Sequence, residues 1–231
     1  MNRIVTKGIV LTRTDFAEAD RIISFLTPDH GKVTVIAKGV RKQKSKLAGG
    51  IELFSISDLT ILKGRGEIYT LMSARLAAHY GNIVKDLNHT NTAYEMIKLT
   101  DKLTQDAAEE GYFNLLKRGF EALDDLQLQP EIVSLWFKMQ LLKLSGHAPN
   151  LRTDASGLKL KRGSYDFDSD EMRFLAKANG AGSYGTDHIK FLRIAVSAAG
   201  PKVLQRIKGS EKLTVAVGPI LSSIINSLVH G

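Results

Sequence analysis

Residues 52–62 read ELFSISDLTIL, and residues 67–74 read EIYTLMSA. In each stretch, side chains at every second position form two distinct faces, which is the period of a β-strand. The intervening residues 63–66, KGRG, form a turn signal because glycine accepts positive φ. The two stretches therefore predict a β-hairpin.

Three more strands are predicted on the N-terminal side of this hairpin, over Gly8–Arg13, Arg21–Leu26 and Lys32–Lys38. The second and third are separated by residues 27–31, TPDHG, in which proline fixes φ and glycine closes the turn. Five strands in about 75 residues suit a small closed barrel, because closure removes exposed sheet edges. We predict an OB-fold over residues 1–80.

Helical periodicity replaces this strand pattern after Gly81. Helices are predicted from about Ile83 to Leu103, over Gly111–Leu126 and over Glu131–Leu144, the last apolar around most of its circumference and so central in a core. Residues 150–185 are predicted to be an irregular insertion with one short helix at Glu171–Ala178. Further helices are predicted at Thr186–Ala198, Val203–Lys208 and Val215–Leu228. The expected fold class is α+β in two domains, with an all-α helical domain over residues 81–231.

Composition predicts an ordinary globular protein of a reducing compartment. The 231 residues are 43% hydrophobic and 24% charged, and none is cysteine, which excludes disulfides, thiolate metal sites and a cysteine nucleophile. The N-terminal apolar run Gly8–Leu11 is too short for a signal-peptide core. Polar residues and Pro219 interrupt Val215–Val229, so we expect no membrane span and a cytoplasmic location.

Positive charge is concentrated in the first third of the chain. The net charge is +8, and residues 1–80 hold 13 basic and 7 acidic side chains. The densest cluster is KGVRKQKSK, residues 38–46, with five cations and no acidic residue. Such a run is often only a solvated loop, but on a barrel loop beside other arginines it favours phosphate binding.

Two motifs fail the tests for cofactor and metal binding. Residues 180–185, GAGSYG, match a dinucleotide fingerprint, but the segment before them reads as helical and position 205 is Gln rather than an acidic residue, which predicts a flexible interhelical loop. Residues 166–177 resemble an EF-hand loop, but Glu171 and Lys177 occupy the positions that need glycine and a bidentate carboxylate.

No histidine pair has metal-ligand spacing, and neither a nucleophile elbow nor a phosphate loop is present. These absences favour a binding protein over an enzyme.

Several stretches together resemble the RecO recombination mediators of bacterial DNA repair. They are GIVL (8–11), EADRI (18–22), LTPDHGK (26–32), AKGVR (37–41), Lys44-Ser45, GRGEIYTL (64–71) and LLKLSGHAPNL (141–151). The resemblance implies an N-terminal OB-fold, a helical C-terminal domain and no catalysis. It further implies binding of single- and double-stranded DNA, annealing of strands coated with single-stranded DNA-binding protein, cooperation with RecR, and indirect loading of RecA.

One departure from the family concerns metal. Many RecO proteins carry a four-cysteine zinc module after the Gly-x-x-Pro-x-Leu stretch, whereas residues 152–177 contain no cysteine. We therefore expect no zinc and no other cofactor.

Candidate site residues follow from the charge pattern and from the resemblance. The nucleic-acid-binding candidates are Arg13, Arg21, Lys38, Arg41, Lys42, Lys44, Lys46 and Arg65. Phe54 and Tyr69 are candidates for base stacking, although such rings are more often core residues. The candidates for binding the acidic C-terminal tail of single-stranded DNA-binding protein are Lys190, Arg193, Lys202 and Arg206. Two alternatives stay open: a nucleic-acid-modifying enzyme that docks through the barrel, and a protein adaptor whose basic loop only adds solubility.

Overall fold

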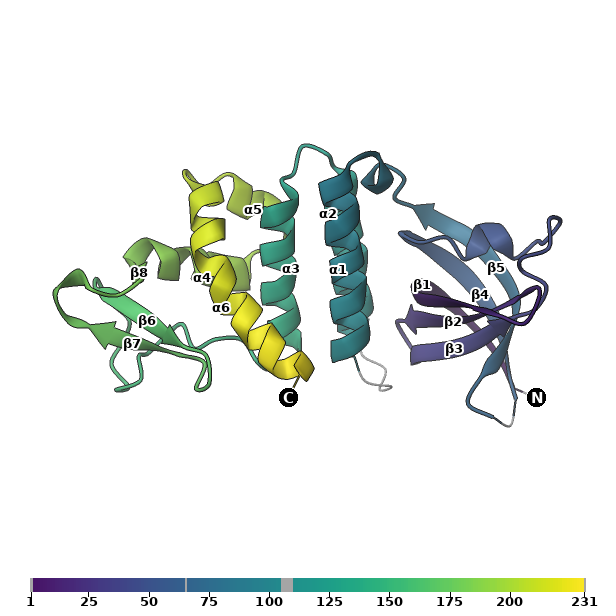
Figure 1. The fold of residues 1–231 in the computed structure, drawn as a ribbon, viewed down its shortest axis with the longest axis horizontal. Coiled ribbons are helices and arrows are strands. Elements are labelled where there is room, and N and C mark those ends of the chain that lie inside the picture. The colour runs from purple at the N-terminus through teal and green to yellow at the C-terminus, as the bar shows by residue number, and fades with distance from the viewer. Residues whose placement is uncertain (1, 65, 105–109, 231) are drawn as a thin grey trace. The chain divides into compact units, whose positions relative to one another are not determined.

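The computed structural model describes residues 2–64, 66–104 and 110–230 (Figure 1). Backbone contacts divide the chain into two compact units, Met1–Leu126 and Gln127–Gly231. The first unit contains a barrel and two helices, and the second contains helices and a small sheet. The two predicted domains, residues 1–80 and 81–231, are a statement about independent folding, and they stay a prediction.

The first unit is built on a closed five-stranded barrel, as predicted. Its strands lie side by side in the order β1-β2-β3-β5-β4. Their bounds are β1 Asn2–Phe16, β2 Asp20–Thr27, β3 Gly31–Ala37, β4 Ser55–Lys63 and β5 Tyr69–His79. The alternation in β3 buries Val33, Val35 and Ala37 and turns the side chains between them outward. This alternation fixes the register, because a slip by one residue would expose the apolar face.

The barrel has two chemically different ends. Since β1 runs antiparallel to both β2 and β4, the β1–β2 turn (17–19) and the segment after β3 lie at one end. We call this the basic end, defined by residues 13–21 and 38–47. The β2–β3 turn (28–30) and the β4–β5 connection (64–68) lie at the other, which we call the pocket end.

Two helices complete the first unit, α1 Leu87–Leu103 and α2 Glu110–Asp124, after the short 3-10 helix η2 Ile83–Lys85. Phe54, which immediately precedes β4, is buried with its ring 5.1 Å from that of Tyr94 on α1 and 5.7 Å from that of Phe120 on α2, measured between centroids. Its suggested role in base stacking is wrong, because the ring is part of the core between the barrel and the helices.

The second unit is organised around α3 Pro130–Leu144, the helix predicted to be central. It packs against α4 Thr186–Ser197, α5 Pro201–Gln205 and α6 Ser210–His230. Trp136 is fully buried, and its indole N–H donates to the carbonyl of Ala198. The segment Ser210–Val229 is long and apolar enough to cross a membrane by length and composition alone. Ile220, Leu221 and Ile224 are buried in this unit, and 33% of the apolar window is buried in all, so the expected absence of a membrane span stays a prediction.

The predicted helix at Glu171–Ala178 is wrong, because Arg173–Lys177 forms strand β7. It pairs with β6 Ser164–Asp168, which also pairs with β8 Tyr184–Gly185. Five residues are too few to separate helical from strand periodicity, and the Asp168 carboxylate stabilises a hairpin turn by accepting from the backbone N–H groups of Asp170 and Glu171. The helical region therefore carries a three-stranded sheet.

Residues 180–185 are also not the predicted interhelical loop. They follow strand β7, with only the 3-10 helix η3 Ala178–Gly180 between, and they lead into α4. A strand thus precedes the glycines, but it belongs to an antiparallel sheet rather than to a βαβ unit. Gly182 packs directly on the backbone of Tyr165, where a Cβ would collide. Gly182 serves this packing, so the rejection of a dinucleotide site stands for a different reason.

Candidate nucleic-acid interface

The segment Lys38–Lys46 is held in place by its backbone rather than by its charged side chains. Gly39, with φ of +66°, donates its N–H to the Asp20 carboxylate over 2.7 Å. The N–H of Arg41 donates to the carbonyl of Ala19 over 2.9 Å, and the side chain of Val40 is buried in the barrel core. The segment is therefore fixed against the β1–β2 turn while its cations face solvent.

Three arginines gather around one carboxylate at the basic end. Nε of Arg21 donates to Asp15 over 2.8 Å, and Nε of Arg41 lies 3.6 Å from the other oxygen of Asp15. The hydrogen bond from Arg21 lowers the pKa of Asp15, partial desolvation opposes that effect, and the charges of Arg41, Arg21 and Arg13 lower it further. Asp15 stays ionised, and the cluster keeps an excess of positive charge.

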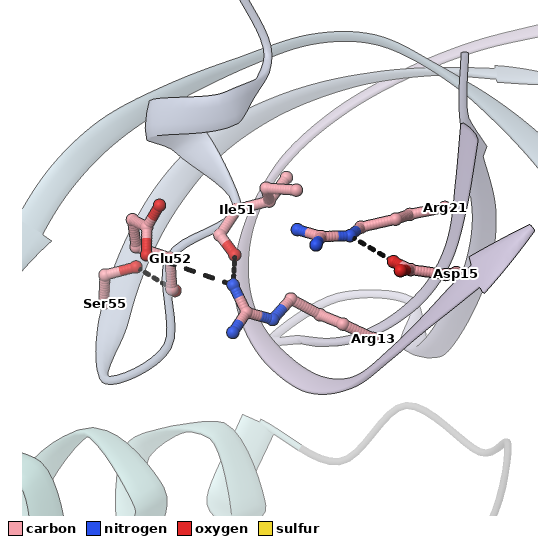
Figure 2. Close-up of polar contacts among 6 residues, drawn as sticks. All are labelled: Arg13, Asp15, Arg21, Ile51, Glu52 and Ser55. Carbon is pink, nitrogen blue, oxygen red and sulfur yellow. Dashed lines mark hydrogen bonds and ion pairs between the residues drawn. The ribbon is translucent and has the colours of Figure 1, made fainter. Parts of the chain in front are cut away.

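Arg13 extends this cluster toward the segment before β4 (Figure 2). Its guanidinium donates to the carbonyl of Ile51 over 3.2 Å and lies 3.9 Å from the carboxylate of Glu52. Both guanidinium groups drawn in Figure 2, those of Arg13 and Arg21, are thus oriented by protein acceptors. A phosphate approaching the basic end would meet cations already placed, which reduces the entropy lost on binding.

The four lysines of the same segment are exposed and, within the described residues, form no ion pair; they are Lys38, Lys42, Lys44 and Lys46. Together with Arg13, Arg21 and Arg41, seven of the eight candidates lie at the basic end. The eighth, Arg65, lies outside the described residues.

The four candidates for binding the tail of single-stranded DNA-binding protein lie in the second unit, and their side chains differ in the contacts that they make. Arg193 donates to the carbonyls of Leu151 (2.9 Å) and Leu160 (3.3 Å), so its guanidinium fastens residues 151–160 to α4. Lys190 lies 3.5 Å from Asp187 on the surface of α4. Lys202 and Arg206 are exposed on α5 and at its C-cap, near the exposed side chain of Val203.

The pocket end contains residues that the sequence interpretation missed. An open pocket of about 560 Å³ is lined by Tyr69 and His30, which the sequence interpretation considered, and by Lys32, Thr34, Lys63 and Glu67, which it did not. His30 lies in the turn that was predicted over residues 27–31. The pocket depends on which strands are neighbours, and no local pattern reveals that.

Residues 152–177, which the sequence predicted to lack a zinc module, are described by the structure, and they bring together no cluster of metal-ligating side chains. Across residues 2–64, 66–104 and 110–230, no three histidine or acidic side chains gather to hold a metal ion. The rings of Tyr165, Phe167 and Tyr184 instead surround Phe174, with centroids 5.1 to 6.2 Å away. Aromatic packing therefore forms the small core of the β6–β8 sheet.

Comparison with known proteins agrees with this architecture. The family model for the N-terminal part of recombination protein O matches residues 1–80, and the model for its C-terminal part matches residues 84–225. The chain belongs to the RecO family. This result confirms the predicted family and the barrel followed by a helical region.

Individual RecO proteins show the extent of the similarity. A DNA repair protein RecO of Dehalococcoides mccartyi is 36% identical over 152 residues, which cover 65% of this chain and 59% of the relative. One from Alkaliphilus metalliredigens is 27% identical over 228 residues, covering 98% of this chain and 90% of the relative. The chain thus matches about three fifths of the length of the first relative and most of the second.

Proposed function

We propose that this RecO-family chain is a cytoplasmic recombination mediator that binds single- and double-stranded DNA and anneals complementary strands without making or breaking a covalent bond. The observation that supports this most directly is the basic end, where a fixed backbone presents four lysines and three arginines. Cations fixed on one surface lower the repulsion between two phosphate backbones, which is the barrier that annealing must overcome.

Salt dependence gives a quantitative test of DNA binding. If about four cations each neutralise one phosphate, a slope of about −0.7 per contact predicts a loss of roughly 50-fold in single-strand affinity between about 50 and 200 mM salt. Fluorescence anisotropy with a labelled oligonucleotide measures this slope. The absence of binding at low salt would contradict the proposal and favour a protein adaptor.

A charge-matched comparison assigns the binding to the basic end. The variant Lys42→Gln/Lys44→Gln/Lys46→Gln removes three cations there, whereas Lys85→Gln/Lys98→Gln/Lys102→Gln removes three cations from η2 and α1 of the same unit. We expect the first variant to reduce the magnitude of the salt slope by about 2, from three lost contacts, and the second to leave it unchanged. Equal effects of both variants on the salt slope would mean that DNA binding depends on the net charge of the protein and not on the position of the cations.

The proposed function also includes binding to partner proteins. We propose that the second unit binds the acidic, apolar C-terminal tail of single-stranded DNA-binding protein, and that the chain acts with RecR to help load RecA. Support comes from Lys202 and Arg206, exposed cations on either side of the exposed apolar side chain of Val203 in the sequence, a combination that suits an acidic peptide with apolar anchors. Lys190 is exposed on α4, where it lies 3.5 Å from Asp187. Arg193 holds backbone carbonyls, and its replacement is expected to affect stability as well as tail binding. Titration of the tail peptide into Lys202→Glu/Arg206→Glu tests this, and unchanged affinity would contradict it.

A further inference from the structure

The pocket at the other end of the barrel exists because one strand pairing is incomplete. β3 pairs with β5 only at Val35–Tyr69 and Ile36–Thr70, in parallel. Among the described residues, the first half of β3 therefore has no strand neighbour on this side. Lys32, Val33 and Thr34 of this half line the pocket instead. Unpaired strand edges are ready partners for hydrogen-bonding ligands.

The pocket walls combine a ring, an apolar surface and an acceptor. Tyr69 is partly exposed, and the ammonium group of Lys63 lies 5.4 Å from its ring centroid. Ile68 beside it is 50% exposed, and Ile4 also lines the pocket. Glu67 supplies a carboxylate that can accept from the amino groups of nucleobases.

The charge balance of the pocket does not suit a phosphate. The ammonium of Lys32 donates to the backbone carbonyl of Asp101 over 2.8 Å and lies 3.3 Å from its carboxylate, so this cation is already compensated. Glu67 opposes Lys63 among the remaining lining residues. An aromatic face with acceptors and little net charge suits a flat, polar-edged ring rather than an anion.

We propose that this pocket binds a nucleobase of a single DNA strand whose phosphates contact the basic end, an inference that rests on the proposed function. The base takes the place of the Lys63 ammonium over the Tyr69 ring, stacks there, and hydrogen-bonds to the edge of β3 and to Glu67. The seven residues of β3 connect the two ends of the barrel and span about 23 Å at roughly 3.3 Å per residue. A strand of several nucleotides covers that distance, within the range of about 4 to 16 nucleotides for such barrels.

The test compares two oligonucleotides of equal length and charge, one with bases and one abasic throughout. Their anisotropy titrations isolate the contribution of the bases, because the phosphate contacts are the same. Stacking on one aromatic side chain predicts that the wild type favours the strand with bases roughly 10-fold. Tyr69→Leu should abolish that preference and keep abasic binding, whereas Tyr69→Phe, which keeps the ring, should retain it. Abasic binding also reports whether each variant is folded and has an intact basic end.

The outcomes separate this inference from the function on which it rests. Wild-type protein that binds both oligonucleotides equally, or a preference that survives in Tyr69→Leu, would overturn the pocket and leave the basic end as the DNA site. Failure to bind either oligonucleotide would overturn the proposed function itself. Complete displacement of the strand by an equal concentration of deoxynucleoside monophosphate would overturn the inference in favour of a site for free nucleotides.

Discussion

Two non-helical segments of the molecule are stabilised in opposite ways. The segment 38–47 at the basic end is fixed through backbone N–H groups and Val40, and its charged side chains remain exposed. The β6–β8 sheet instead directs its rings inward around Phe174. A segment fixed by its backbone leaves its side chains free for ligands, whereas a segment fixed by its side chains contributes stability. The comparison therefore predicts that substitutions separate into those that affect binding and those that affect folding.

The largest expected effect is on stability and comes from Phe174. This side chain has 0% exposure, and Phe174→Ala should lower the free energy of unfolding by about 3 to 5 kcal/mol, through lost burial and the cavity left behind. Phe174→Leu should cost less. Chemical denaturation of the full chain measures both losses. DNA affinity of the folded variants should equal that of wild type, and weaker DNA binding would break the proposed separation.

Asp20 tests the backbone anchor at the basic end. Asp20→Ala removes the acceptor for Gly39 N–H, and a lost hydrogen bond of about 1 kcal/mol predicts roughly fivefold weaker DNA binding, although the protein becomes more positive. Asp20→Asn keeps an acceptor oxygen and removes only the charge, so its affinity should equal or exceed that of wild type. Anisotropy titration of the two variants measures this. Tighter binding by Asp20→Ala would show that charge alone, without a fixed backbone, determines affinity.

Asp15 tests the arginine cluster through its pKa. The pKa of Asp15 is below its ordinary value of 3.8, chiefly because of the hydrogen bond from Arg21. The ionised form therefore favours the folded state: this stabilisation is present above the ordinary pKa and is lost as pH falls through the lowered one. Arg21→Gln should raise the pKa of Asp15 in an NMR titration of carboxyl resonances. Arg3→Gln, a change at the opposite end of β1, should leave it unchanged, and equal shifts in both variants would contradict the cluster geometry.

The smallest effect is expected from metal removal. Aromatic rings around Phe174 form the core of the β6–β8 sheet, so a chelator should leave the melting temperature and DNA affinity unchanged. Calorimetry with and without chelator checks this. A lowered melting temperature would mean that ligands outside the described residues bind a structural metal.

The barrel could be predicted because a strand with one buried face needs an apolar side chain at every second position, and this alternation is visible in the sequence. Val33, Val35 and Ala37 in β3 lie on the buried face as the alternation indicated. Phe54 could not be assigned, since its positive φ of 54° places it outside the strand pattern and its ring contacts helices that begin over 30 residues later. Strand β7 was misread because RFLAK is too short to have a decisive period.

In the candidate site, too, features of one short segment could be predicted, whereas contacts between residues far apart in the sequence could not. The positive charge of residues 38–46 is visible in the sequence, but the bond from Arg41 N–H to Ala19 that orients the segment is a contact between distant residues. The pocket at Tyr69 depends on the two-residue pairing of β3 with β5, for which the sequence has no local signal.

The central claim is that fixed cations at the basic end allow two DNA strands to pair. It is tested most directly by the rate of annealing of complementary oligonucleotides, measured in chelator and without nucleotide. The account predicts that wild type and Lys85→Gln/Lys98→Gln/Lys102→Gln anneal equally fast, and that Lys42→Gln/Lys44→Gln/Lys46→Gln is slower by about tenfold or more, as expected when several phosphate contacts are lost. Equal annealing rates for the two triple variants would contradict it.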